Sequence, residues 1–436
     1  MTENKYASHL DFIPQRERKA VQLNRLNDKI RQVYEKNSFY RDKFECVDYK
    51  IQEIGHLEDI EKLPFTSKEE LSRQYPFGIC SVPLDEIVEI HTSSGTKRTP
   101  VLGGYTRNDL KIWKEVMKRS LSLAGVTGQD ILQNAYGYGL FTGGLGVHYG
   151  AQAIGAMVIP ASGGNSKRQL ELMRDLGTTV LACTPSYALY LSELLREGDM
   201  KKDQVKLRLG IFGAEPWSER IRSKLEERLN ITALDIYGLT EIIGPGVAQE
   251  CKYKSGLHIF EDHFYPEIIS PEKLKVLPEG EEGELVITTL TREGMPIIRY
   301  RTGDVTSLAR GKCECGRTIA RIGRIKGRSD DMIKIRGVAV FPSQIEEALL
   351  TINDIEPHYQ IFLTNPKYRD NIEVQVESSP ELWKKQKSAV EAKQTEVEER
   401  INSRLGLRIN ASIVEPKKLI RSEGKIKRVV DLRRKE

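Results

Sequence analysis

Short apolar runs alternate with helical patterns through the middle of the chain, from about Leu84 to Gly311. The runs at Ala156–Ile159, Thr179–Ala182 and Leu209–Phe212 are each followed closely by Gly, Pro or Ser. Helical spacing of apolar residues appears between and after these runs, at Lys167–Leu176 and Glu219–Leu229. Buried strands that alternate with covering helices are typical of layered α/β folds. The pattern therefore predicts a large, multi-layered α/β domain.

The two ends of the chain differ from this middle part. Pro14–Phe44 carries apolar positions at helical spacing, which predicts a helix. A Gly- and charge-rich stretch, Arg321–Asp331, precedes a smaller unit, so we expect an α/β domain at 1–326 and a small α+β domain at 327–436. The elements expected in the small domain are a strand near Met332–Val340, a helix from Ser343, strands near Tyr359–Leu363 and Asn371–Val376, and a helix at Leu382–Leu405.

Charge balance and cysteine content limit the classes of function. The 67 basic and 62 acidic residues give a net charge of +5, evenly spread, which argues against nucleic-acid binding. A run of about 20 apolar residues is absent, so we expect no membrane span. The chain starts with charged residues rather than an apolar secretory core. Six cysteines in such a chain favour reduced thiols or metal ligands, and hence a cytoplasmic protein.

A candidate phosphate-binding loop, His91–Pro100, follows the apolar run Ile87–Ile90. It contains three consecutive hydroxyl residues, a glycine and then two cations. Hydroxyls and loop N–H groups can donate to phosphate oxygens, and glycine allows a close approach of the backbone. The loop does not have the pattern G-x-x-x-x-G-K-[ST], and taken alone it favours an ordinary surface turn over a phosphate site.

Five further segments support a phosphate-binding role for this loop. They are Gly213–Pro216, Asp235–Glu241, Tyr300–Asp304, Gly327–Asp331 and Ser422–Arg428. In this order and at these separations they resemble the motifs of the adenylate-forming superfamily, which contains acyl-CoA synthetases and the adenylation domains of peptide synthetases. A resemblance to the phenylacetate–CoA ligase branch rests on Asn37–Arg41, Leu63–Lys68, Tyr136–Gly144, Cys183–Tyr187 and Gly256–His263.

The resemblance implies a reaction and a set of nucleotide-binding residues. A carboxylic acid, with phenylacetate as the default, would attack the α-phosphorus of ATP, and the acyl group would then pass to coenzyme A. Tyr237 would stack on adenine, Asp304 would accept hydrogen bonds from the ribose hydroxyls, and Glu241 would bind Mg²⁺. The nucleotide-binding residues implied in this way are Ser93, Ser94, Gly95, Thr96, Gly213, Ala214, Glu215, Pro216, Asp235, Tyr237, Gly238, Thr240, Asp304 and Arg328.

A lysine near the C-terminus is implied to be catalytic. An ammonium group on a flexible stem can reach both the substrate carboxylate and the α-phosphate. The family pattern, Gly-Lys followed by an aliphatic residue, places this role on Lys425, with Lys427 as a competing candidate. Members of the family rotate the small domain between adenylation and thioester formation, and Asp330 aligns with their hinge residue. The resemblance thus implies a mobile C-terminal domain.

The acyl group needs an apolar pocket. We expect Tyr136, Phe141, Ile236 and Pro245 to line it, since aromatic and aliphatic side chains suit a phenyl ring, with ordinary core packing as the alternative. Two positions depart from the family pattern. The phosphate loop lacks the second glycine within Thr96–Thr99, and Ala339 stands where relatives commonly carry Asn.

A second group of residues has the composition of a metal site. Cys313 and Cys315 form a Cys-x-Cys pair downstream of Cys251 and His258, giving a Cys₃His set that suits tetrahedral zinc. Part of the ligase branch carries zinc on a similar pattern. Four protein ligands leave no open coordination position, so the ion would be structural. Unlinked cysteines remain an alternative, as does His263 in place of His258, and we expect the other three cysteines in the core.

Two other functions remain open from the sequence. The chain could pass its adenylate to an acceptor other than coenzyme A, such as a carrier protein or a cofactor. It could also be a binding homologue without activity, although the presence of Glu241, Asp304 and Lys425 argues against that. The amphipathic N-terminal helix and the resemblance suggest a homodimer. The expected partners are therefore a small carboxylic acid, ATP and coenzyme A, with no nucleic acid and no membrane.

Overall fold

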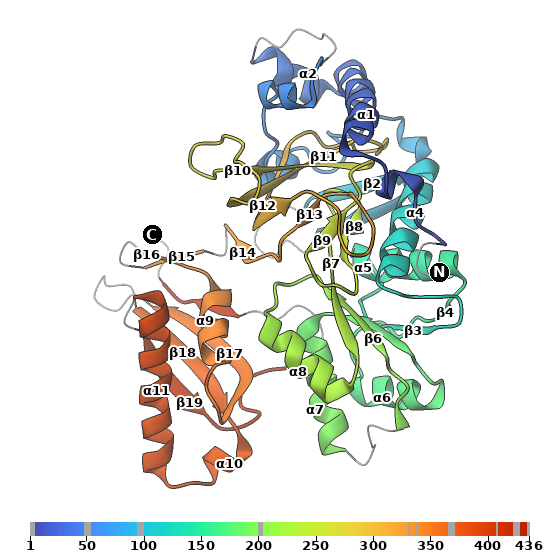
Figure 1. The fold of residues 1–436 in the computed structure, drawn as a ribbon. Coiled ribbons are helices and arrows are strands. Elements are labelled where there is room, and N and C mark those ends of the chain that lie inside the picture. The colour runs from blue at the N-terminus through green and yellow to red at the C-terminus, as the bar shows by residue number, and fades with distance from the viewer. Residues whose placement is uncertain are drawn as a thin grey trace.

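The computed structural model of the chain describes residues 5–47, 54–93, 100–198, 204–329, 332–335, 338–364, 371–406, 409–421 and 428–433. Most of the described residues belong to a large N-terminal domain, and those from Ile333 onward form a smaller C-terminal domain with its own hydrophobic core. Figure 1 shows the smaller domain, coloured orange to red, beside the larger one. The predicted α/β class is confirmed.

The large domain is built on a 12-stranded sheet. Its strands are β3 (Ile131–Asn134), β4 (Met157–Ile159), β5 (Val180–Cys183), β6 (Leu209–Gly213), β7 (Thr232–Leu239), β8 (Gly244–Glu250), β9 (Leu257–Ile259), β10 (Phe264–Ile269), β11 (Glu282–Thr289), β12 (Tyr300–Ala309), β13 (Arg321–Ile322) and β14 (Gly327–Arg328). Their order is β10-β11-β12-β13-β9-β8-β7-β6-β5-β3-β4, with β14 beside β12. Strands β4, β3, β5, β6 and β7 are parallel, whereas β8 runs antiparallel to β7.

Helices cover both faces of the parallel half. They are α4 (Arg107–Leu123), α5 (Thr142–Ile154), α6 (Ser166–Asp175), α7 (Pro185–Glu197) and α8 (Glu219–Leu229). Successive side chains of a strand point to opposite faces. In β5, Val180 and Ala182 belong to the hydrophobic cluster of α4 and α5, while Leu181 and Cys183 belong to that of α6, α7 and α8. Both faces are covered, which explains why these strands are continuous apolar runs in the sequence.

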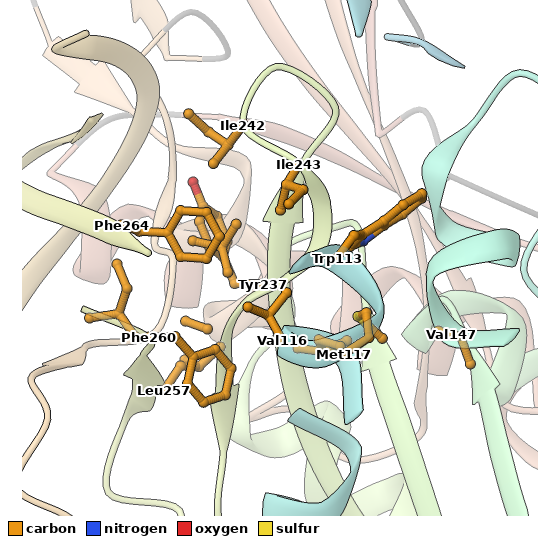
Figure 2. Packing of buried hydrophobic residues seen from close by; sticks show 14 of the residues in the cluster. Trp113, Val116, Met117, Val147, Tyr237, Ile242, Ile243, Leu257, Phe260 and Phe264 are labelled. Carbon is orange, nitrogen blue, oxygen red and sulfur yellow. The ribbon is translucent and has the colours of Figure 1, made fainter. Parts of the chain in front are cut away.

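One face of α4 is packed against the strand reversal between β7 and β8. Trp113, Val116 and Met117 are all fully buried. Figure 2 shows Val116 on the side of α4 that faces Tyr237, and Trp113 extending toward the side of Val147. The Trp113 indole N–H donates to the carbonyl of Pro245 at 3.1 Å. This helix therefore fixes the position of the reversal.

The N-terminal region forms a helical layer on the large domain. Its elements are the 3₁₀ helices His9–Asp11, Leu57–Lys62 and Leu84–Glu86, the helices α1 (Gln15–Lys36), α2 (Ser38–Glu45) and α3 (Lys68–Arg73), and a hairpin of β1 (Ile87–Thr92) and β2 (Leu102–Thr106). The helical pattern predicted at Pro14–Phe44 is confirmed as two helices with a break at Asn37, which has an extended backbone and caps α2 by accepting from the Tyr40 N–H at 3.1 Å. The apolar face of α1 packs within this chain, so it offers no support for the predicted dimer.

A buried arginine ties the N-terminal region to the large domain. Arg119 of α4 makes two hydrogen bonds of 3.0 Å to the carboxylate of Asp262, and it also pairs with Asp11. Its guanidinium lies 4.5 Å from the centre of the Phe260 ring. The side chains of Arg119, Asp11 and Asp262 are at most 4% exposed. One cation therefore holds two buried carboxylates from distant parts of the chain.

The small domain is a mixed sheet covered by helices. Its elements are β15 (Ile333–Ile335), β16 (Val338–Val340), α9 (Pro342–Leu349), β17 (Ile355–Thr364), β18 (Asn371–Ser378), α10 (Pro380–Trp383), α11 (Lys387–Leu405), β19 (Asn410–Val414) and β20 (Val429–Asp431). Four strands form a sheet in the order β19-β18-β17-β20, and β15 pairs with β16 in a separate hairpin.

Two predictions for this domain are wrong in detail. The segment Met332–Val340 is not one strand, because β15 and β16 pair antiparallel and satisfy one another's backbone groups. The helix predicted at Leu382–Leu405 is two helices, since α10 ends at Trp383 and α11 begins at Lys387. Among the described residues, every helix is either too short or too polar to cross a lipid bilayer.

Replacing Arg119 by Met should destabilise the chain by about 3 kcal/mol, because the change removes the guanidinium that binds both buried carboxylates. It leaves Arg317, 3.5 Å from Asp11, and Arg25, 3.9 Å from Asp262, as the remaining arginines. Arg174→Met is a matched control, since Arg174 and its partner Asp175 are 45% and 56% exposed. That change should cost less than about 0.5 kcal/mol. Chemical unfolding of both variants measures the difference, and equal unfolding midpoints would contradict the structural role of Arg119.

Candidate functional site

The candidate site lies where the parallel strands β6 and β7 end. Neighbouring parallel strands present their carboxyl ends at one edge of a sheet, which is where ligands bind in open α/β folds. Gly213, the last residue of β6, pairs with Ile236 of β7. The segments Gly213–Pro216 and Gly238–Glu241 are therefore neighbours at this edge.

Two glycines permit the close packing of these strands. A Cβ atom on Gly213 would lie 2.2 Å from the carbonyl oxygen of Ile236, and one on Gly238 would lie 2.0 Å from the carbonyl oxygen of Gly244. Real Cβ atoms do not approach so closely, so any other residue would push the strands apart. The next residue, Ala214, has a φ of 71°, which an L-residue rarely adopts. This backbone conformation is typical of a functional site.

Tyr237, Asp304 and Arg328 form a hydrogen-bonded group beside these glycines. The Tyr237 hydroxyl donates to Asp304 Oδ2 at 2.6 Å, and Arg328 donates to Asp304 Oδ1 at 3.1 Å. The last two residues face each other because β12 and β14 pair Asp304 with Arg328. Burial, together with the charge of Asp304, raises the pKa of Tyr237 well above its usual value of 10.0. The phenol is therefore a hydrogen-bond donor, while Asp304 stays an acceptor with two oxygens.

Glu241 follows β7 at the strand reversal. Its carboxylate is 6% exposed and lies 3.7 Å from the ammonium of Lys68, at the start of α3. Arg292 donates to the carbonyl of Glu241 at 2.7 Å and also to that of Ile242, which fixes the backbone here. In the sequence, Lys68 stands out only as part of the family segment Leu63–Lys68, and no motif identifies Arg292. Neither contact has a local sequence signal, because both residues are far from Glu241 along the chain.

Ser93 closes the base of the predicted phosphate loop. Its N–H donates to the carbonyl of Val101 at 2.9 Å, and its hydroxyl accepts from the Val101 N–H at 3.0 Å. The two ends of the loop are therefore held together. The other predicted loop residues, Ser94, Gly95 and Thr96, lie outside the described residues, as do Asp330 and Lys425.

The remaining predicted nucleotide-binding residues differ in exposure. Ala214 and Pro216 are exposed, Glu215 is half-buried, and Thr240 is buried. One Glu215 oxygen accepts from the backbone N–H of Ser186 at 2.8 Å, in the first turn of α7. A carboxylate is favourable there because the first N–H groups of a helix lack helical partners. Glu215 thus anchors the segment Gly213–Pro216 to α7.

Asp235 is a fully buried acid two residues before Tyr237. Burial and the nearby carboxylate of Glu250 raise the pKa of Asp235 from 3.8 to about 7. Its backbone N–H donates to Glu250 at 2.8 Å, and Arg222 binds the two oxygens of Glu250 at 2.8 and 2.9 Å. Asp235 therefore belongs to a buried group with Glu250 and Arg222.

The four predicted acyl-pocket residues differ in how deeply they are buried. Tyr136 and Ile236 are buried in the same hydrophobic cluster as Trp113. Pro245 is half-buried and touches this cluster through its hydrogen bond to Trp113. Phe141 is 51% exposed at the start of α5. The structure therefore places Tyr136 and Ile236 in one large hydrophobic cluster, sets Pro245 against it and leaves Phe141 at the surface.

The predicted metal ligands are gathered at one place. The ligand atoms of Cys251, His258, Cys313 and Cys315 all lie within 4.8 Å of one another. The Cys251 and Cys313 sulfurs are 3.8 Å apart, and Cys315 Sγ is 3.5 Å from His258 Nε2. In contrast His263, the alternative ligand, bonds through Nδ1 to Thr291 at 2.8 Å.

These distances fit a tetrahedral ion. Zinc–sulfur bonds of about 2.3 Å place two ligand sulfurs on a tetrahedron about 3.8 Å apart.

The other three cysteines were expected in the core, and that expectation is only partly right. Cys183 is buried and Cys80 is half-buried, but Cys46 is exposed.

The arrangement can bind a polyol and a hard cation side by side. Asp304 can accept hydrogen bonds from two neighbouring hydroxyls, and Tyr237 presents an aromatic ring at the same edge. Glu241 offers carboxylate oxygens of the kind that Mg²⁺ prefers. A nucleotide with its metal ion supplies both groups, since the ribose carries two neighbouring hydroxyls and Mg²⁺ is a hard cation.

Family models match two parts of the chain. Residues 125–291 match that of the AMP-binding enzymes, and residues 337–433 match that of the AMP-binding enzyme C-terminal domain. The phenylacetate-coenzyme A ligase of Escherichia coli is 46% identical, over 96% of this chain and 95% of that protein. That of Thermus thermophilus is 43% identical, over 98% of this chain and 100% of that protein.

A solved relative resembles this structure more in one state than in another. 2-Hydroxyisobutyryl-CoA ligase in the postadenylation state, with 2-HIB-AMP, superposes with a TM-score of 0.91 at 28% identity, over 97% of this chain and 91% of that one. The same ligase in the thioesterification state, with 2-HIB-AMP and CoA, superposes with a TM-score of 0.72 at 28% identity and equal coverage.

The raised pKa of Asp235 predicts a pH-dependent effect of Asp235→Asn. Between about pH 4 and 7 the folded chain holds a proton on Asp235 that the unfolded chain has lost, and the resulting stabilisation disappears as the pH rises to 7. Asn cannot lose this stabilisation. The thermal unfolding midpoint of the variant, relative to that of the unmodified chain, should therefore rise from pH 5 to pH 8. A constant or falling difference would contradict the raised pKa.

Proposed function

Since the chain belongs to the phenylacetate–CoA ligases of the AMP-binding enzyme family, we propose that phenylacetate is its substrate and that this acid passes through an acyl-adenylate to coenzyme A. The chain is an AMP-forming acid–CoA ligase. The proposal rests above all on the identity of 43–46% to phenylacetate–CoA ligases over nearly the whole chain.

The first step is attack of a carboxylate oxygen on the α-phosphorus of ATP. A phosphorus–oxygen bond forms, and the bond to pyrophosphate breaks. In the second step the coenzyme A sulfur bonds to the acyl carbon, the thiol loses its proton, and AMP leaves with the carboxylate oxygen. The protein contributes mainly by positioning the reactants and compensating their charge.

Tyr237, Asp304 and Arg328 would hold the nucleoside part of ATP. Asp304 would accept from the ribose hydroxyls while its hydrogen bonds with Tyr237 and Arg328 keep it oriented. Ser93 would present the phosphate loop, whose base it closes. Tyr136, Ile236 and Pro245 would surround the phenyl ring, and Phe141 would lie at the surface end of that pocket.

Glu241 would hold the magnesium ion. The residue fits this role, since its buried carboxylate is fixed at the strand reversal beside the nucleotide-binding group. Bound Mg²⁺ would compensate the charge of the phosphates. Lys68, 3.7 Å from Glu241, would add a positive charge at the same place.

Lys425 would act from the C-terminal domain. We propose domains at 1–326 and 327–436 with Asp330 as the hinge, the short strand β14 (Gly327–Arg328) of the second part being paired with β12 of the large sheet. The ammonium of Lys425 would bridge the substrate carboxylate and the α-phosphate of ATP. A ligase that uses a carrier protein or a cofactor as its acceptor is the alternative. The E. coli and Thermus relatives, both coenzyme A ligases, favour coenzyme A.

Structural zinc is proposed for the Cys₃His cluster of Cys251, His258, Cys313 and Cys315. Three thiolates and an imidazole within 4.8 Å of one another suit this ion in both chemistry and distance. Zinc would tie the loop after β8 to the loop after β12. Because β8 follows Glu241 and β12 carries Asp304, the ion would stabilise two segments of the nucleotide site without touching the reactants.

The cytoplasm is the compartment we propose, because the six cysteines are free thiols in the structure and part of the proposed zinc site needs reduced sulfur. A homodimer stays a prediction from the family resemblance.

An assay with phenylacetate, ATP and coenzyme A tests the function. The unmodified chain should form phenylacetyl-CoA with one AMP and one pyrophosphate per thioester. Lys425→Ala should slow acid-dependent pyrophosphate release by about 10²–10³, because a positioned charge at the reacting phosphate is lost. Lys427→Ala is the matched control and should retain most of the rate. AMP release without a thioester would contradict the CoA assignment, and an active Lys425→Ala variant would contradict the role of Lys425.

Zinc content provides the test of the metal site. The purified chain should carry about one zinc ion per chain, and Cys315→Ser should lose most of it because one tetrahedral ligand is missing. Its thermal unfolding midpoint should fall as well. Cys46→Ser is the control, since Cys46 is exposed and outside the cluster. Equal zinc content in the two variants would refute the assignment.

A further inference from the structure

A buried acid of the N-terminal domain faces basic side chains of the C-terminal domain. Glu193 lies on α7, and its side chain is 9% exposed. One oxygen contacts His358 Nε2 on β17, and the other accepts from Arg421 Nε at 3.2 Å. Arg228 of α8 approaches Glu193 to 3.7 Å. A single carboxylate thus binds two groups across the domain boundary.

The charge of Glu193 is maintained by these neighbours. Burial alone would raise its pKa, but the contacts with His358, Arg421 and Arg228 outweigh burial and lower the pKa below its usual value. Arg228 also pairs with Glu356 of the small domain at 3.3 Å, so it does not serve Glu193 alone. The contacts of Glu193 with His358, Arg421 and Arg228 are therefore ionic and largely shielded from water.

Arg421 connects this group to the segment that carries the proposed catalytic lysine. It binds both oxygens of Glu377 at 2.7 and 2.8 Å. Glu377 is fully buried and also accepts the backbone N–H groups of Lys417 and Leu419. The chain from Lys417 to Arg421 is thus fixed within the small domain, and Glu193 binds its end. Lys425 follows shortly after in the sequence.

These contacts belong to one orientation of the two domains. The whole chain superposes on 2-hydroxyisobutyryl-CoA ligase far better in the postadenylation state than in the thioesterification state, at equal coverage. The orientation found here is therefore that of the postadenylation structure. A different orientation of the small domain would separate His358 and Arg421 from Glu193, since both contacts are short and directional.

We propose that Glu193 is a positioning residue for adenylation, which latches the C-terminal domain through His358 and Arg421 in the orientation that presents Lys425 to the acid and ATP. The inference rests on the proposed two-step reaction. Release of the latch would accompany the change to thioester formation. Glu193 therefore acts on the first step alone.

Glu193→Gln tests the latch, because the amide keeps the shape of the side chain but lacks its charge. Acid-dependent exchange of pyrophosphate into ATP should fall at least about tenfold, as expected when a buried, hydrogen-bonded charge pair loses one partner. Thioester formation from synthetic phenylacetyl-adenylate and coenzyme A should stay within about twofold, or rise, because that step does not use the latch.

Glu197→Gln is the matched control. Glu197 stands on the same helix and pairs with Lys417 across the same boundary at 2.7 Å, but that pair is exposed. Exposed pairs contribute little, so both steps should stay within about twofold of the unmodified chain. The comparison separates the buried latch from general charge effects at this surface.

His358→Gln gives an independent variant from the other side of the boundary. Combined with Glu193→Gln, it should slow adenylation by less than the product of the single effects, because both changes break the same contact. Thermal unfolding checks that each variant is folded.

Equal slowing of both steps by Glu193→Gln, or multiplicative effects in the double variant, would show a merely structural role and overturn the proposal, as would an unchanged adenylation rate. Loss of thioester formation by the unmodified chain would instead refute the proposed function.

Discussion

The reversal of strand direction between β7 and β8 determines where the candidate site can form. Up to β7 the sheet is parallel and buried on both faces, and from β8 onward it is antiparallel. At the junction Gly238 lies so close to Gly244 that no side chain fits between them. Tyr237 and Glu241 flank this point, and the antiparallel half brings Asp304 back to meet Tyr237. A wholly parallel sheet would not place that carboxylate there.

Buried arginines hold the segments around this junction. Arg292 binds backbone carbonyls at Glu241, Arg222 binds Glu250 next to Asp235, and Arg299 binds both oxygens of Glu267. Each guanidinium is almost fully buried, which is costly unless its donors find acceptors. Planar guanidinium groups can satisfy several acceptors at once. The same contacts that offset the cost of burial therefore make the backbone of the site rigid.

The boundary between the domains has a different character. Each domain has its own hydrophobic core, and the contacts between them include hydrogen bonds and ion pairs, together with Leu350 of the small domain, which packs into the cluster of α6, α7 and α8. Polar interfaces of this kind can open and reform, whereas shared apolar cores cannot do so without exposing surface to water. A reaction with two successive steps at one site benefits from such a boundary. In the proposed reaction, the junction between β7 and β8 would hold the nucleotide while the smaller domain changes its position.

Much of the local structure was predictable. The apolar runs became β4, β5 and β6, and the helical patterns became α6 and α8 within one residue at each end. The predictions did not include the interruptions: Asn37 ends one helix and caps the next, and the segment Met332–Val340 pairs with itself. Such breaks depend on a single cap or on strand pairing, to which hydrophobic periodicity is blind.

The sequence by itself determined the fold class, the order of the motifs and the chemical types of the site residues, since these follow from local patterns of polarity and spacing. It also identified the Cys₃His set that the structure gathers within 4.8 Å. Only the tertiary structure decided that Lys68 and Arg292 meet at Glu241, and that Arg421 reaches Glu193 on the other domain. These pairs are distant along the chain, and their proximity results from how the layers and domains pack, which no local pattern encodes.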